Sequence, residues 1–82
     1  MPRFFFHVVD GVGIASDEDG LELENIAAAR DVAVEGARDI LAAEIRYGRI
    51  DLSWRIDVAD EGGAVVLTLP FSDAVRVASD PH

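Results

Sequence analysis

The sequence contains no cysteine and only two histidines, His7 and His82. Without cysteine the chain cannot form a disulfide, and it has no thiolate to act as a nucleophile or a metal ligand. Zinc sites take three or four ligands, mostly from cysteine and histidine. His7 and the last residue do not supply such a set, so we expect no metal and no cofactor.

Long apolar runs are also absent. The run from Phe4 to Val9 is interrupted by His7 and stops at Asp10. It is shorter than the core of a signal peptide and far shorter than the roughly 20 residues of a membrane helix. We therefore expect a cytoplasmic protein that does not contact membranes.

Basic residues are scarce. Seven arginines and no lysine stand against 16 acids, which gives a net charge of −9. Such a charge is repelled by phosphate backbones and by anionic lipid surfaces. The composition therefore argues against a nucleic-acid partner.

The first third of the chain favours β-structure. Residues 3–9 are aromatic or β-branched, as in strands. Asp10-Gly11 is a strong turn signal because glycine tolerates a positive φ, and residues 12–16 can return as a shorter strand. The alternation at residues 21–24 is compatible with either a further short strand or a lead into a helix.

A helix is predicted from Ile26 to Tyr47, where small and apolar residues recur at steps of three and four. Asn25 is a good N-cap, and Gly48 is a natural C′ residue. Gly36 lies in the middle of this helix, and we interpret it as a point of close approach to the sheet.

Two further strands are predicted after the helix, at residues 54–60 and 64–69, joined by a loop at Glu61-Gly62-Gly63. Pro70 ends the second strand, and we expect the chain from Ser72 onward to fray. The predicted organisation is a single domain over residues 1–75, followed by a flexible tail over residues 76–82.

These elements predict an α+β domain of the order ββαββ, in which one long helix packs on one face of a mostly antiparallel four-stranded sheet. Apolar residues at helical or alternating spacing should form its core. The predicted core residues are Phe4, Phe6, Val8, Ile26, Ala33, Ala37, Ile40, Leu41, Trp54, Ile56, Val58, Val65, Leu67 and Leu69.

The acidic stretch 16–25, SDEDGLELEN, raises the question of a cation site. If Gly20 takes the sixth position of an EF-hand loop, positions 1 and 12 are Ala15 and Ile26, which supply no ligand. We therefore expect a solvated turn that leads into the helix. A weak cation contact at Asp17–Asp19 remains open.

Catalytic patterns are missing. The sequence places no serine or aspartate beside His7, and none of the serines lies in a G-x-S-x-G elbow. Gly11-Val12-Gly13 lacks the third glycine of a dinucleotide fingerprint, and no helix follows it. We expect a protein that is not an enzyme.

The sheet face away from the helix is the most informative feature. One helix leaves this face open to water or to a partner, and apolar residues there indicate a candidate interface. Scattered surface apolarity is the competing interpretation. The candidate interface residues are Phe5, His7, Val9, Arg55, Val66 and Thr68.

The function expected from this face is homodimerisation or binding of another protein. A second hypothesis follows from the net charge and the layout of a small sheet with a helix. It is an antitoxin-like regulatory module that binds a basic protein.

Several motifs in chain order carry a resemblance: MPRFFFH at 1–7, DG at 10–11, DEDG at 17–20, EL at 22–23, AAR at 28–30, LTLPF at 67–71 and DAV at 73–75. Through these motifs the chain resembles a family of short uncharacterised bacterial proteins, a rhizobial-type domain of unknown function. The resemblance covers nearly the whole chain and implies no activity and no catalytic residue.

Overall fold

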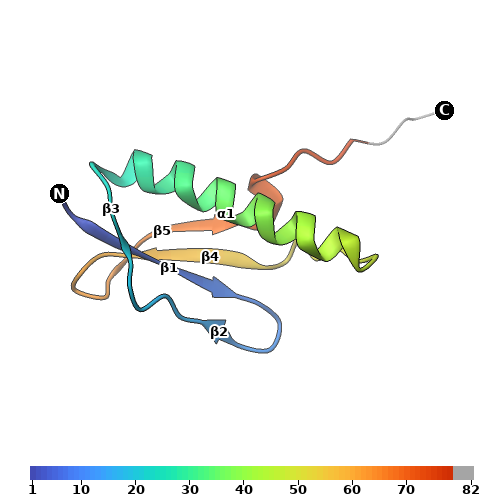
Figure 1. The fold of residues 1–82 in the computed structure, drawn as a ribbon, viewed down its shortest axis with the longest axis horizontal. Helices are drawn as coiled ribbons and strands as arrows, with labels where there is room; N and C mark the ends of the chain where they lie inside the picture. Colours follow the sequence, from blue (N-terminus) through green and yellow to red (C-terminus); the bar gives the residue numbers. More distant parts are fainter. Residues whose placement is uncertain (79–82) are drawn as a thin grey trace.

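The computed structural model describes residues 1–78 (Figure 1). Three strands precede the helix and two follow it, so the order is βββαββ and not the expected ββαββ, and the sheet has five strands and not four. The α+β class is confirmed. The elements are β1 (Arg3–Val9), β2 (Ile14–Ala15), β3 (Leu21–Glu22), α1 (Ile26–Arg46), β4 (Arg55–Ala59), β5 (Val65–Pro70) and the 3₁₀ helix η1 (Phe71–Asp73).

The sheet is built around β1. Its order is β2-β1-β4-β5, with β3 also paired to β1, and every pairing is antiparallel. β2 pairs with the end of β1 at Val8 and Val9, whereas β3 pairs with its beginning at Arg3 and Phe4. The first two residues of the alternating segment 21–24 therefore form a strand, because their backbone completes the edge of β1.

Helix α1 begins where the sequence predicts. The Oδ1 atom of Asn25 accepts a hydrogen bond from the N–H of Ala28 at 2.9 Å, and Gly48 follows the helix with a φ of +81°. Its buried stripe consists of Ala29, Ala33, Ala37 and Leu41. Three of these four residues are alanines, whose small side chains let the helix lie close to β4, β5 and η1.

The last turns of α1 project beyond the ends of the strands (Figure 1). After Leu41 most helical residues are exposed, and Ile45 is 58% accessible. The helix carries many charged residues, and no helix within residues 1–78 is long and apolar enough to cross a membrane.

The core contains most of the predicted residues and three others, Ala29, Phe71 and Ala74, that the predicted set does not include. Ile26 and Val65 were predicted in the core, but they are 46% and 55% exposed. Phe71 and Ala74 are buried in their place.

Phe71 is buried because the chain continues its sheet contacts past Pro70. The N–H of Phe71 donates to the carbonyl of Trp54 at 2.8 Å, and η1 then turns the chain onto α1. The prediction that the chain frays from Ser72 onward is therefore wrong at Ala74, which is buried. Part of the predicted tail, residues 79–82, lies outside the described residues.

Gly36 has room for a side chain. A methyl group there would meet Cδ1 of Ile56 at 3.8 Å, an ordinary van der Waals distance, so the approach to the sheet is less close than we predicted. Glycine in a helix interior costs about 1 kcal/mol relative to alanine. We expect Gly36→Ala to raise the free energy of unfolding by about 0.5–1 kcal/mol. Urea denaturation measures this, and Ala42→Gly at an exposed helical position should show the opposite change; a loss of stability in Gly36→Ala would contradict the prediction.

Candidate functional site

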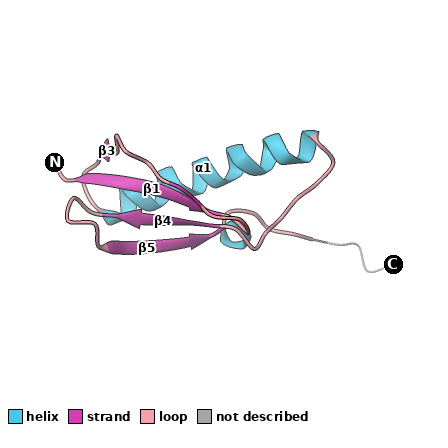
Figure 2. Cartoon of the chain, turned by 90° about the horizontal axis from the view of Figure 1, so that it is seen from below, coloured by secondary structure: helices cyan, strands magenta, loops and turns pink. Residues whose placement is uncertain are grey.

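The sheet face away from α1 collects five of the six predicted interface residues. Residues directly opposite one another in antiparallel strands point to the same face. Phe5, His7 and Val9 of β1 lie opposite Ala59, Asp57 and Arg55 of β4, and Thr68 of β5 lies opposite Asp57. Figure 2, seen from below, shows β1 crossing in front of α1, so that no part of α1 covers this face of β1.

Val66 does not belong to this face. The pairing of β4 with β5 shifts register between Val58 and Ala59, so Val66 is the extra residue of a β-bulge. It packs against the core cluster on the helix side. Strict alternation along β5 would place it with Thr68, and a bulge is not readable from the residue pattern.

The open face is mostly half-buried and has balanced charges. Phe5, His7 and Val9 are partly exposed, and Ile14 of β2, opposite Val9, adds an apolar side chain that is 64% accessible. The charged side chains on the face occur in ion pairs. The pairs are Arg3–Glu22 at 3.2 Å and Arg55–Asp57 at 3.1 Å.

A polar band crosses the middle of the face. The Oδ1 atom of Asp57 accepts hydrogen bonds from Nε of Arg55 and from Oγ1 of Thr68, each at 3.1 Å, and His7 lies opposite Asp57. The sequence did not indicate that Asp57 would stand beside His7, because the two residues meet only through strand pairing. The band suits hydrogen bonding to another surface, since it lies on an open sheet and not in a cleft.

The acidic loop at residues 16–20 completes the edge of β1. The pairing of β1 is interrupted between β2 and β3, and there the N–H of Phe6 donates to Oδ2 of Asp17 at 3.1 Å. The other oxygen, Oδ1, accepts from the N–H groups of Asp19 and Gly20 at 3.2 and 3.1 Å. The carboxylate of Asp17 thus takes the place of a strand carbonyl, and the expected turn is a specifically hydrogen-bonded one.

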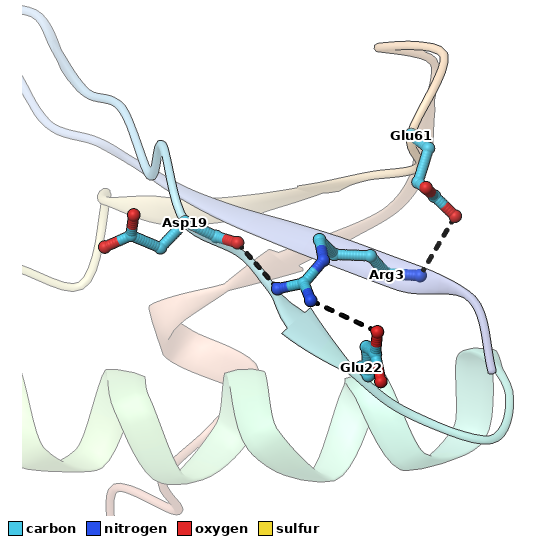
Figure 3. A network of polar contacts seen from close by, with 4 residues as sticks. All are labelled: Arg3, Asp19, Glu22 and Glu61. Carbon is cyan, nitrogen blue, oxygen red and sulfur yellow. Dashed lines mark hydrogen bonds and ion pairs between the residues drawn. The ribbon is translucent and has the colours of Figure 1, made fainter.

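The carboxylate of Glu61 accepts a backbone N–H in the same way at the other edge of β1 (Figure 3). The N–H of Arg3, beyond the end of the pairing with β4, donates to Oε1 of Glu61 at 3.3 Å. The guanidinium of Arg3 donates to the carbonyl of Asp19 at 2.8 Å and to Glu22 at 3.2 Å. Arg3 therefore ties the acidic loop, β3 and the loop after β4 together.

The acidity of Asp17 has a physical cause. Partial burial raises the pKa of its carboxyl group, but hydrogen bonds from the N–H groups of Phe6, Gly20 and Asp19, together with nearby His7, outweigh that effect. The pKa of Asp17 consequently lies below its ordinary value of 3.8. Ionised Asp17 therefore stabilises the fold above that ordinary value, and this contribution is lost as the pH falls through the lowered pKa.

Asp17→Asn is expected to lower the free energy of unfolding at neutral pH by about 1–3 kcal/mol. The new NH₂ group is a donor and would face a backbone N–H that the carboxylate oxygen accepts in the wild-type chain. Urea denaturation should show this difference shrinking as the pH falls to the lowest value at which the wild-type chain stays folded. Glu18→Gln, at an exposed neighbour, is the control and should be near neutral. A difference that is independent of pH would contradict the role given to the carboxylate.

Apart from the sheet face, an open hollow lies between the tip of the β1–β2 hairpin and the end of α1. Its apolar side chains come from Val12, Ile50 and Trp54, and the carboxylates of Asp10, Glu44 and Asp51 surround them. Each of these carboxylates already has a partner within the chain. The hollow offers no free set of ligands, and the part of the chain that is described contains no group of three or more His, Asp or Glu able to hold a metal.

Residues 3–72 match a described family, "Domain of unknown function (DUF6894)". The chain belongs to the DUF6894 family. No curated protein and no solved structure matches it. The expectation of a family of unknown function that covers nearly the whole chain is confirmed for this DUF6894 domain, and its bacterial, rhizobial-type origin stays a prediction.

Proposed function

We propose that the DUF6894 domain is a protein-interaction module and that the sheet face away from α1 is its contact surface. The observation that carries the proposal is that α1 packs on the other face, on β4 and β5, so Phe5, Val9 and Ile14 remain accessible. The paired charges of this face contrast with the net charge of −9 of the whole chain. A face of this kind suits another protein surface or a second copy, and we propose no catalytic role and a cytoplasmic location.

Phe5→Asp tests the proposal. Aromatic residues are frequent among the side chains that dominate binding energy, so we expect association to weaken roughly tenfold or more. Sedimentation velocity measures self-association, and titration calorimetry measures binding to an isolated partner protein. Ile14→Arg provides a second variant at an exposed position of the same face, and Val77→Asp, at an exposed residue outside the strands, is the control.

Self-association and binding of a different protein can each be excluded by a separate result. A chain that stays monomeric excludes homodimerisation through this face. Partner binding that is unchanged by both Phe5→Asp and Ile14→Arg excludes the face altogether. Circular dichroism of each variant confirms that the change acts on binding and not on folding.

The antitoxin-like alternative is favoured by a different surface. Asp31, Glu35 and Asp39 are spaced by four along α1, are exposed and line one shallow surface region. Such a row suits a basic protein. Binding through it should weaken with rising salt and in the double variant Asp31→Asn/Glu35→Gln, but not in Phe5→Asp. Binding that is insensitive to both salt and the double variant would exclude it.

A further inference from the structure

His7 holds the acidic loop through a nitrogen that can bind a proton. Its Nδ1 atom accepts a hydrogen bond from the backbone N–H of Asp17 at 3.0 Å. An accepting Nδ1 carries no hydrogen, so neutral His7 keeps its hydrogen on Nε2. When the ring is charged, both nitrogens are donors. Protonation therefore removes the acceptor and sets two donors against each other.

Asp17 is the residue that organises the loop. Besides the bond to His7, its carboxylate accepts the N–H groups of Phe6, Asp19 and Gly20. The carbonyl of Asp19 in turn accepts from Arg3. A change at His7 therefore acts on the point where the loop is attached to β1.

We propose that His7 is a pH-sensitive latch: the neutral ring holds the loop of residues 16–20 through the N–H of Asp17, and the protonated ring gives up this bond. The charged groups that face His7 are Asp17 from the loop and Asp57 from β4, with Arg55 paired to Asp57. A charged ring that has lost the N–H of Asp17 can pair with the carboxylate of the same residue, a stronger interaction.

The latch lies beside the open sheet face. A methyl group at Gly20 would come within 2.8 Å of the ring of Phe5, so the loop borders that side chain as well as His7. Protonation of His7 adds a positive charge, and loss of its bond to the loop changes the surroundings of both residues. A resulting pH dependence of binding rests on the proposed function, whereas the loss of the bond concerns the chain alone.

The experiment compares wild-type chain with His7→Asn by ¹⁵N NMR, without any partner. The Oδ1 atom of asparagine can accept the same N–H but does not titrate. Histidine as a residue type ordinarily changes charge between about pH 8 and pH 5, so the two chains are compared at these two values. At the lower pH we expect the amides of Asp17 and Gly20 to exchange at least roughly tenfold faster in wild type than in His7→Asn, and at the upper pH equally fast.

Ring ¹⁵N shifts of the wild-type chain provide a second measurement that needs no variant. His7 should carry its hydrogen on Nε2 at the upper pH, and the amide of Asp17 should shift together with the ring as it titrates. The latch is overturned if neutral His7 carries its hydrogen on Nδ1. It is also overturned if the amides do not follow the ring or respond alike in His7→Asn. Failure of Phe5→Asp to alter binding would overturn the contact face and leave the latch standing.

Discussion

Phe71→Ala is expected to lower the free energy of unfolding by about 3–5 kcal/mol. The side chain of Phe71 has no exposed surface, and its ring packs edge-on against Trp54 with centroids 5.9 Å apart. An 82-residue chain has a total stability of about 4–12 kcal/mol. This one substitution should therefore remove much of it and lower the melting temperature by about 12 °C or more.

Circular dichroism during heating and urea denaturation measure the change. Ser72→Ala, at the exposed next residue of η1, should leave the melting temperature almost unchanged. Phe71→Leu keeps most of the volume and should lie between the two. If Phe71→Ala melted within a few degrees of wild type, η1 would not close the core, and the chain after Pro70 would be as loosely held as its composition indicates.

Gly20→Ala is expected to cost about 2–5 kcal/mol, from two effects that add. Gly20 has a φ of +69°, a left-handed conformation that costs a residue with a side chain roughly 1–2 kcal/mol. Its new methyl group would also lie 2.9 Å from the backbone oxygen of Phe4 and 2.8 Å from the ring of Phe5. Such overpacking typically adds about 1–3 kcal/mol.

Two other glycines separate these effects. Gly63 has a φ of +86° and nothing within 4 Å of an added methyl group, so Gly63→Ala should show the conformational cost alone. Gly13 has neither a positive φ nor a close neighbour, so Gly13→Ala should be nearly neutral. Equal losses in Gly20→Ala and Gly63→Ala, measured by urea denaturation, would show that the acidic loop does not pack tightly against β1.

Local patterns predicted the elements well where neighbours in sequence decide them. Asn25 caps the helix, Gly48 follows its end, and β1 spans the aromatic run, because each depends on residues one to four positions away. The turn at Asp10 was predicted in the right place for the wrong reason. Gly11 does not adopt a positive φ, and the side chain of Asp10 instead accepts the N–H groups of Val12 and Gly13.

The candidate face could be predicted only in part. Alternation along β1 and β4 placed Phe5, His7, Val9 and Arg55 correctly, because residues in a regular strand point to opposite faces in turn. The bulge at Val66 breaks that alternation. The meeting of His7 with Asp17 and Asp57 depends on register between segments, which one strand alone does not contain.

The amino-acid sequence by itself determined the class of the protein: a small, acidic, cysteine-free α+β domain with one amphipathic helix. These properties follow from composition and from short-range periodicity. Only the tertiary structure decided that Asp17 and Glu61 complete β1, that Phe71 closes the core and that α1 lies over β4 and β5. The physical reason is that an unpaired N–H or an uncovered apolar surface can be satisfied by residues from several distant segments, and packing of the whole chain selects among them.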